Sequence, residues 1–450
     1  MSDSVQIPSK LLSNLSSASE LVHKHDFFRV VSHYDADGIS AAGIICQTLH
    51  RAGKQFQVTL LKNLNEKEMK AISEMETDCL IIADMGASYI QELEKLNWDV
   101  IVLDHHRSED ESDKIHHINP HLYGIDGMTA ACGASMSMLF SLAVSESNWD
   151  LVQLAVAGMA GDRQHMNGMI GINEYLTVEA EKRGLLKKIT GSLIPPGSLA
   201  DELFLSTDPF IAGVSGEHEG VYALLEEAGI PIESRFENLE PEQRRKLSTL
   251  ISLILLDNGV TLGTMMEVSR PRFLLSEWGM DAEGLASLFN ACGRMDLEGM
   301  GVALSMGDPE SLKESLAINT EYRQKIIESV MKVKENGLTA LENIQFFHSH
   351  SSGFTGIMCG IAMQFFADPD KPTFGLSRKD ENVRISGRAT WKLLDRGVDL
   401  SLALRDACKN CGGSGGGHRI ASGGAVPIEN EERFLTELDA IIGNQLITSK

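Results

Sequence analysis

The sequence predicts an α/β protein: a doubly wound parallel sheet with a mostly helical insertion, then a long connector helix and a smaller α/β domain. One observation is a set of short apolar runs, which are typical of strands buried on both faces of a parallel sheet. Another is that segments with helical spacing separate these runs, as expected when helices join parallel strands. The third is an uninterrupted mix of charged and apolar residues at 308–334, which predicts the connector helix.

The elements follow in chain order. Strands are expected at residues 27–31, 58–61, 79–83 and 100–103, where the apolar runs lie. Helices are expected at residues 39–52, 66–75, 89–96, 129–144 and 151–160. From residue 191 to about residue 280, Pro and Gly pairs separate helix-like stretches, which predicts the helical insertion. Strand-like segments at 373–376 and 383–388 belong to the final domain.

Composition places the chain among globular proteins, with 43% hydrophobic and 23% charged residues over 450 positions. No apolar run reaches the roughly 18 residues of a membrane helix, and the N-terminus lacks a signal-peptide pattern. We therefore expect a soluble cytoplasmic protein with no membrane partner. Seven cysteines, an odd number, indicate reduced thiols. Cys408 and Cys411 have zinc-ligand spacing and His418 could join them, but plain thiols are the simpler interpretation.

The net charge of −23 is unusual for a protein that handles nucleic acid, but the charge is unevenly distributed. Residues 371–419 contain ten Lys or Arg and five Asp or Glu. A locally basic segment on an acidic body suits an anionic substrate bound at one place. The alternative is that this segment is merely a solvated face.

Potential metal ligands follow three of the predicted strands. His33, Asp35 and Asp37 follow the first, Asp84 follows another, and residues 104–106 (Asp-His-His) follow a third. Taken alone, Asp84 would be read as a helix N-cap and the His pair as surface residues. Because the carboxyl ends of parallel strands meet at one edge of a sheet, the three sets together predict a metal site there.

Ligand chemistry narrows the choice of metal. Carboxylate oxygens with two imidazole nitrogens suit Mn²⁺ or Mg²⁺ better than a metal selected by thiolates. His116, His117 and His121 form a second cluster, but Asn119 and Pro120 between them mark a loop, so these three are expected at the surface.

These motifs resemble those of a known family. Residues 33–38, Asp84, residues 104–106 and residues 158–162 resemble, in order and spacing, the four motifs of the DHH phosphoesterase superfamily. Residues 290–295 look like a segment typical of RecJ-type nucleases, and residues 416–423 look like the glycine-histidine signature of the DHHA1 domain. The combination is similar to archaeal RecJ-like single-strand-specific exonucleases. This resemblance implies a DHH domain over residues 1–307 with its insertion at about 191–280, a connector at 308–337 and a DHHA1 domain at 338–450.

The resemblance also implies roles for individual residues around two Mn²⁺ or Mg²⁺ ions. One ion would be held by His33, Asp35 and Asp84. The other would be held by Asp37, Asp84, His105 and Asp162, so that Asp84 bridges the two. Asp104 would orient His105 without touching a metal. His106 would face the substrate, and His418 and Arg388 would act with it in catalysis.

Two segments of the final domain are expected to bind substrate phosphates. Alternation places Arg384, Ser386 and Arg388 on one face of a strand, where two guanidiniums and a hydroxyl can hold successive phosphates. Gly-rich loops are often only flexible, but here the glycines that end in Gly416 and Gly417 are followed at once by His418 and Arg419. With the family likeness, we interpret this run as a phosphate-binding nest.

The resulting hypothesis is a metal-dependent exonuclease that hydrolyses single-stranded DNA or RNA, in replication or repair. Its alternatives are a phosphodiesterase for short oligonucleotides or cyclic dinucleotides, a manganese pyrophosphatase, and a replication scaffold with little activity. The complete ligand set weighs against a pure scaffold. Replication factors such as the GINS complex are possible partners that the resemblance suggests.

Overall fold

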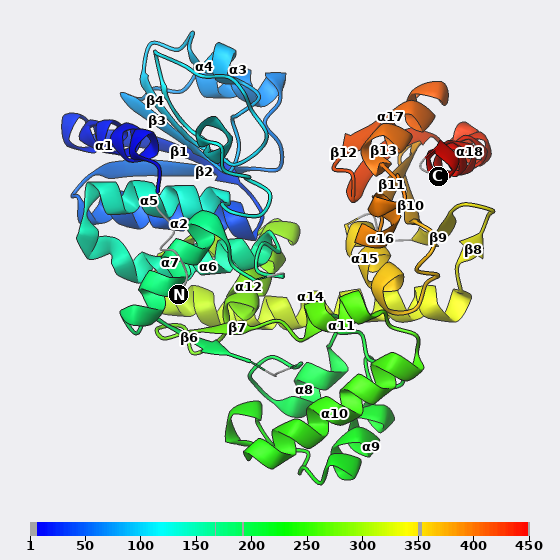
Figure 1. Ribbon diagram of the computed structural model, residues 1–450. Helices are drawn as coiled ribbons and strands as arrows, with labels where there is room; N and C mark the ends of the chain where they lie inside the picture. Colours follow the sequence, from blue (N-terminus) through cyan, green and yellow to red (C-terminus); the bar gives the residue numbers. More distant parts are fainter. Residues whose placement is uncertain (1–6, 167, 191–192, 350–352, 449–450) are drawn as a thin grey trace. The chain divides into compact units, whose positions relative to one another are not determined.

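The structure, a computed structural model, describes residues 7–166, 168–190, 193–349 and 353–448 (Figure 1). The first two residues of the expected insertion, 191 and 192, lie outside the described residues. Contacts divide the chain into two compact units. The first unit is Met1–Pro195 with Arg270–Tyr322, and the second is Pro196–Ser269 with Arg323–Lys450.

The first unit contains the predicted parallel sheet, with strand order β2-β1-β3-β4-β5. Its strands are β1 (Phe27–His33), β2 (Gln55–Leu61), β3 (Cys79–Ala83), β4 (Asp99–Leu103) and β5 (His116–Ile118). The register pairs Ser32 with Ala83, and Ala83 with Leu103. The carboxyl ends of the three motif strands are therefore level, which confirms the expectation that their following residues meet at one edge.

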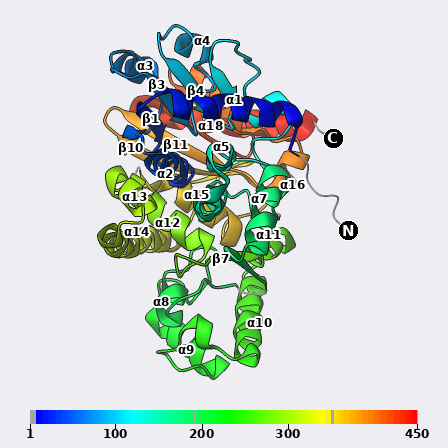
Figure 2. The same ribbon diagram turned by 90° about the vertical axis from the view of Figure 1, so that its left-hand side faces the viewer.

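Helices cover both faces of this sheet, as the doubly wound prediction requires. Leu80 and Ile82 pack toward α3 (Glu66–Ser73) and α4 (Ile90–Leu93), whereas Ile81 of the same strand packs into the cluster on the opposite face. That opposite face is covered by α1 (Ser9–Lys24), α2 (Ala36–Arg51) and α5 (Gly133–Val144). Figure 2 shows α3 and α4 on one side of the strands and α2 and α5 on the other.

The remaining elements of the first unit come after the parallel sheet in the chain, and several of them pack against α2 or α5. They are η1 (Pro120–Tyr123), η2 (Glu146–Leu151), α6 (Val152–Gly161), α7 (Gly171–Lys182), β6 (Leu186–Ile189), β7 (Arg272–Leu275), α12 (Ala282–Arg294), α13 (Glu298–Ser305) and the start of α14 (Pro309–Asn336). The helix expected at 129–144 begins only at Gly133. The preceding residues form a turn, in which Asp126 accepts hydrogen bonds from the Thr129 hydroxyl and the Met128 N–H.

The second unit is built on a mixed sheet with strand order β12-β13-β11-β10-β9-β8. Its strands are β8 (Thr339–Ala340), β9 (Gln345–Ser349), β10 (Thr373–Lys379), β11 (Asn382–Arg388), β12 (Ser414–Gly417) and β13 (Ala421–Pro427). On one face, Phe374, Leu404 and Phe434 join a core under α17 (Leu400–Asn410) and α18 (Glu431–Thr448). The other face is approached by α15 (Thr355–Phe365), and α16 (Trp391–Asp395) and η4 (Ile428–Asn430) complete the domain.

The helical segment of the chain packs in the second unit. It comprises α8 (Leu199–Phe204), α9 (His218–Ala228), η3 (Phe236–Asn238), α10 (Pro241–Asp257) and α11 (Leu262–Val268). Arg323 of α14 binds Glu202 of α8 at 2.8 Å, and the Phe210 and Phe366 rings lie 5.6 Å apart. These contacts group the segment with residues 323–450. The sequence assigns it to the DHH domain as an insertion, and those domain bounds stay a prediction. The long helix expected at 308–337 is α14, and none of the helices in the described residues has the length and apolar character of a membrane span.

Candidate metal centre

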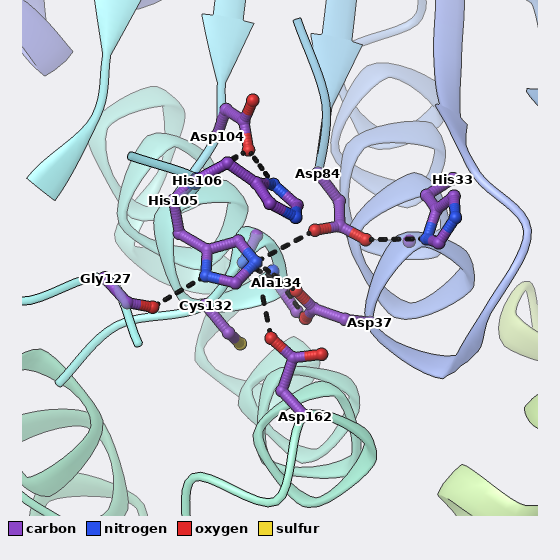
Figure 3. A network of polar contacts seen from close by, with 12 residues as sticks. His33, Asp37, Asp84, Asp104, His105, His106, Gly127, Cys132, Ala134 and Asp162 are labelled. Atoms are coloured by element: carbon purple, nitrogen blue, oxygen red, sulfur yellow. Dashed lines mark hydrogen bonds and ion pairs between the residues drawn. The ribbon is translucent and has the colours of Figure 1, made fainter. Parts of the chain in front are cut away.

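The residues expected at the strand ends do converge (Figure 3). His33 is the last residue of β1, Asp84 follows β3, and Asp104 follows β4. Asp35 is the N-cap of α2, where its side chain accepts a hydrogen bond from the Gly38 N–H at 3.1 Å. A Cβ atom at Gly38 would lie 2.3 Å from the His33 carbonyl oxygen, so only glycine permits this tight turn from strand to helix.

His105 lies at the middle of the cluster and faces three carboxylates. Its Nε2 atom is 3.2 Å from Asp84 Oδ1, 3.3 Å from Asp162 Oδ2 and 3.8 Å from Asp37 Oδ2. Its Nδ1 atom is 2.7 Å from the Gly127 carbonyl oxygen, which can only accept a hydrogen bond. Nδ1 therefore carries a proton, and in the neutral ring the lone pair of Nε2 points at the carboxylates, as a metal ligand requires.

Asp84 connects the two halves of the cluster. Its Oδ1 faces His105, while its Oδ2 lies 3.5 Å from His33 Nδ1, which is also 3.0 Å from Asp35 Oδ2. The Asp84 side chain is 3% exposed, and its backbone has the left-handed φ of 54° that Asp tolerates better than most residues. One carboxylate thus reaches both histidines, as expected of a bridging ligand.

Asp37 is held by the beginning of α5. Its carboxylate accepts hydrogen bonds from the Gly133 N–H at 2.7 Å and the Ala134 N–H at 2.9 Å, where the helix dipole favours negative charge. A Cβ at Gly158 would lie 2.5 Å from Asp37 Oδ1, and one at Gly133 would lie 2.6 Å from Asp84 Cβ. These two glycines make room for the buried carboxylates.

Burial and mutual repulsion shift the titration of this cluster. Burial, with the charges of Asp84 and Asp162, raises the pKa of Asp37 well above its ordinary value. Burial likewise raises the pKa of Asp162 to about 7, although the charge of His105 opposes this. Carboxylates packed this closely in a dry site need positive charge to remain ionised.

The histidines respond in the opposite direction. Burial alone would lower the pKa of His33, but hydrogen bonds and charge from Asp35 and Asp84 raise it to about 11. The pKa of His105 is also raised well above its usual value, against burial, by Asp162 and Asp84. For Asp84, hydrogen bonds from both rings outweigh burial and lower the pKa. The cluster thus attracts positive charge, which a divalent cation can supply.

Asp104 holds the ring of His106 and not the ring of His105. Its Oδ1 is 2.8 Å from His106 Nδ1 and accepts the backbone N–H of His105 at 2.7 Å, while its Oδ2 accepts the Ala87 N–H at 2.8 Å. The sequence led us to expect that Asp104 orients the ring of His105, but that ring is oriented by the Gly127 carbonyl. His106 is about half exposed, and its pKa is raised by Asp104.

Further supports of this centre were not foreseen. The Asn290 side chain accepts a hydrogen bond from the Ala36 N–H at 3.2 Å, and a Cβ at Gly293 would lie 1.9 Å from the Tyr34 carbonyl oxygen. The segment 290–295 therefore packs on the turn from β1 to α2, which carries Asp35 and leads directly to Asp37. The Gly127 carbonyl and the side chain of Gln164 support His105, and no sequence motif marked either.

Other candidates from the sequence stand apart from the centre. His117 is buried and not exposed as expected, and its Nδ1 donates a hydrogen bond to the Asp110 carbonyl at 2.7 Å. Cys408 and Cys411 are buried free thiols. Among the described residues, every group of three or more His, Cys, Asp and Glu side chains with metal-ligand proximity lies in the centre described above.

In the second unit, the alternation predicted for β11 is confirmed. Arg384, Ser386 and Arg388 lie on its more exposed face, and Val383 and Ile385 point into the core. The end of the glycine run is a strand and not the expected loop, and its role in phosphate binding stays a prediction. Residues Ser414–Gly417 form β12, an edge strand paired antiparallel with β13, because glycine residues allow its backbone to pack closely on α17 and β13.

His418 and Arg419 lie in the turn that follows β12. The His418 N–H donates to the Ala421 carbonyl at 2.9 Å, which closes the turn to β13. Arg419 is paired with Asp399 at 3.3 Å and remains largely exposed. Both residues thus follow directly after β12, in the segment for which the sequence predicts substrate binding.

Comparison with known families agrees with this arrangement. Residues 28–160 match the N-terminal domain model of the DHH family, and residues 343–444 match the DHHA1 domain model. An uncharacterized protein of Methanocaldococcus jannaschii, MJ0831, is 29% identical over 436 residues, which cover 95% of this chain and 96% of that protein. The first match contains the first three motifs and residues 158–160 of the fourth, and it ends before Asp162.

Solved structures show the same fold at low sequence identity. A structure of exonuclease RecJ bound to manganese has a TM-score of 0.60 and 17% identity, with 97% of this chain and 95% of that chain covered. A structure of CDC45 from Entamoeba histolytica has a TM-score of 0.63 and 12% identity, with 96% and 98% covered. With both domain models matched and the motif residues gathered at one sheet edge, the chain belongs to the DHH superfamily and has the RecJ-like DHH and DHHA1 fold.

Proposed function

We propose that this protein is a two-metal phosphodiesterase, and specifically a RecJ-like exonuclease that hydrolyses single-stranded DNA or RNA. The observation that carries the proposal is the position of Asp84, whose two oxygens face His105 and His33. Asp35 accompanies His33, and Asp37 and Asp162 accompany His105. Two adjacent sets of ligands that share one carboxylate are the arrangement expected for a pair of ions.

The donor set fits Mn²⁺ or Mg²⁺. It consists of carboxylate oxygens and imidazole nitrogens, without a cysteine among the proposed ligands. The buried carboxylates also require more positive charge than the two histidines provide. Divalent ions bound here would lower the pKa of an attacking water and neutralise charge that develops on the phosphoryl oxygens.

His106 is the proposed substrate-facing group of the centre. Asp104 fixes its Nδ1, so that the ring has one orientation and its Nε2 remains available. Since the side chain is 51% exposed, it can reach a ligand, unlike the deeply buried His105. We propose that it binds the phosphate or donates a proton to the leaving oxygen.

The face of β11 provides the proposed phosphate-binding surface, with His418 and Arg419 at its margin. Pairing aligns Gly416, Gly423, Ser386 and Gly375 in one row across four strands. Nothing lies within 4 Å of a Cβ built at Gly416, so part of this row is open and without side chains. Thr355 of α15 packs against the row at Gly375, so the open part lies toward Gly416. Arg384 and Arg388 lie two positions to either side of Ser386, which suits a sugar-phosphate backbone that approaches this open part.

Product analysis tests the proposed function. End-labelled single-stranded DNA and RNA of about 20 nucleotides would be incubated with the protein in Mn²⁺ or Mg²⁺. We expect stepwise release of mononucleotides, and the order in which label is lost from each end gives the polarity. Hydrolysis of dinucleotides but not of longer strands would instead indicate the short-substrate alternative. No hydrolysis by metal-loaded protein, with co-elution of the GINS complex, would indicate a scaffold.

Replacing Arg388 with alanine tests the phosphate-binding surface. We expect weaker binding of single strands and a slope of log affinity against log salt that is shallower by about 0.7, because one phosphate contact is lost. Binding would be measured by fluorescence anisotropy at several salt concentrations. Arg405→Ala is the matched control, since Arg405 is an exposed arginine of the same unit paired with Asp406 on α17. An unchanged slope for Arg388→Ala would contradict the assignment.

A further inference from the structure

A chain of buried polar side chains lies behind the metal centre. Gln164, two residues after Asp162, is 7% exposed. Its Nε2 donates to the Gly127 carbonyl at 3.0 Å and to the Ala131 carbonyl at 3.2 Å, and its Oε1 accepts from Asn173 Nδ2 at 2.6 Å. Gln164 is therefore fixed by three hydrogen bonds in a buried environment.

The first of these bonds reaches His105. The Gly127 carbonyl accepts both the Gln164 amide and His105 Nδ1, which uses its two lone pairs. A Cβ at Gly127 would lie 2.0 Å from the His105 carbonyl oxygen, so this loop is packed directly against the histidine. By holding the Gly127 carbonyl, Gln164 determines where the ring hydrogen bond of His105 is anchored and where Nε2 points.

The second bond reaches Asp37. Ala131 immediately precedes Cys132, the N-cap of α5, and the next two N–H groups hold the Asp37 carboxylate. Gln164 thus connects the supports of His105 and Asp37 while it shares a short chain segment with Asp162. His105, Asp37 and Asp162 together form one of the groups of side chains that could hold a metal ion.

The far end of the chain fixes the orientation of the Gln164 amide. Asn173 is fully buried, and its Oδ1 accepts from the Ser135 hydroxyl of α5 at 2.5 Å. Its Nδ2 must then donate to Gln164 Oε1, which leaves the Gln164 NH₂ group facing the two carbonyls. Every member of the chain has a partner, as a rigid buried network requires.

We propose that Gln164 is a positioning residue that aligns His105, Asp37 and Asp162 for one metal ion, with Asn173 holding Gln164 in turn. The inference deepens the proposed function, and its hydrolytic part rests on that function. Groups that orient metal ligands without touching the metal typically contribute about 10- to 100-fold in metal affinity or activity. Gln164 acts by holding the Gly127 and Ala131 carbonyls, whose segments support His105 and Asp37, and it does not contact substrate.

Gln164→Ala and Gln164→Glu test the proposal. The glutamate variant keeps the length of the side chain but removes both donors that face carbonyl oxygens. We expect each variant to bind Mn²⁺ about 10- to 100-fold more weakly, measured from free Mn²⁺ by electron paramagnetic resonance. At saturating Mn²⁺ we expect lower kcat with an unchanged KM for the labelled strand.

Gln153→Ala is the matched control. Gln153 is another buried glutamine of the first unit, and it bonds the backbone of Asp150 and Glu277. We expect this variant to lose stability but to keep the wild-type Mn²⁺ affinity. Asn173→Ala removes the partner of Gln164 Oε1 and keeps the two contacts of Gln164 with carbonyl oxygens. We expect it to lose less Mn²⁺ affinity than the Gln164 variants. If the Gln164 variants do not fold, the Mn²⁺ affinity of Asn173→Ala tests the proposal.

The outcomes separate this inference from the proposed function. Wild-type Mn²⁺ affinity in the folded Gln164 variants, or in Asn173→Ala when those variants do not fold, would overturn the positioning role. So would an equal loss of affinity in Gln153→Ala. A wild-type protein that binds Mn²⁺ but cleaves no nucleic acid would overturn the exonuclease proposal alone, because the comparison of metal affinities does not depend on the substrate.

Discussion

Asp84→Ala is expected to lower hydrolysis of a labelled single strand by at least about 1000-fold, equivalent to about 4 kcal/mol of transition-state stabilisation. One oxygen of Asp84 lies 3.2 Å from His105 and the other lies 3.5 Å from His33. Among the contacts of the described residues, no other proposed ligand reaches both histidines. Loss of Asp84 affects both proposed ions. Binding of the single strand should largely survive, because the proposed phosphate-binding residues lie elsewhere in the chain.

The measurement combines three readouts on one preparation: rate of label release, Mn²⁺ binding and strand binding. Asp113→Ala is the control, since Asp113 is an exposed acid of the loop that follows the Asp-His-His motif. We expect wild-type behaviour from it in all three. Full hydrolysis by Asp84→Ala would remove the basis for the metal assignment, whereas loss of strand binding together with activity would indicate a defect beyond the centre.

Glu283→Ala is expected to destabilise the first unit by about 3 to 5 kcal/mol, because it breaks a buried ion network. Glu283 lies 2.6 Å from Arg270, 3.3 Å from Arg272 and 2.9 Å from His165. Both arginine side chains are at most 3% exposed, so removal of the carboxylate leaves buried positive charge with less compensation. The midpoint of urea unfolding measures the effect.

The same network predicts a pH dependence. Burial alone would raise the pKa of Glu283, but Arg272, His165 and Arg270 hold it well below its ordinary value. Its contribution to stability is therefore complete above the unfolded pKa of about 4.5 and is lost as the pH falls toward the folded pKa. We expect the stability difference between wild type and Glu283→Ala to shrink when the pH is lowered below about 4.5.

A glutamate with exposed partners provides the comparison for this second prediction. Glu179 also contacts two cations, Lys182 and Arg183, but their side chains are 64% and 39% exposed, unlike the buried arginines around Glu283. Exposed ion pairs contribute about 0 to 1 kcal/mol, so Glu179→Ala should have a small effect with little change across this pH range. Equal losses in the two variants would contradict a special role for the buried network.

The metal ligands could be predicted from sequence because they depend on local order. Short apolar runs fix the strands, and parallel pairing places the residues after each strand at one edge of the sheet. His33, Asp84 and Asp104 follow from this rule with no knowledge of packing. The alternation of Arg384 and Arg388 on β11 follows in the same way from the period of two residues in a strand.

The supports of those ligands could not be predicted, because they depend on packing between distant segments. The carbonyl of Gly127 has no side-chain signature, and Gln164 reaches it across 37 positions of chain. Asp104 bonds the ring of His106 rather than that of His105 because local chain direction, not motif order, decides which ring is near. The strand at 414–417 forms because its glycines pair with β13, although glycine has little strand preference of its own.

The grouping of the helical segment depends on similar long-range contacts. The pair of Arg323 with Glu202 joins positions 121 residues apart, and either residue alone reads as an ordinary surface charge. His117 is another example. It is buried and donates a hydrogen bond from Nδ1 to the Asp110 carbonyl, and the loop residues Asn119 and Pro120 gave no sign of this contact.

The left-handed backbone of Asp84 determines which inactive variant of this residue is best suited to binding a substrate without cleaving it. Alanine at this φ of 54° adds about 1 to 2 kcal/mol of strain, whereas asparagine adopts the conformation readily and keeps the outline of the side chain. Asp84→Asn would therefore leave the loop after β3 in place while it removes the shared negative charge. Co-crystals of that variant with an uncleaved single strand would display the scissile bond and the residues that recognise its neighbours.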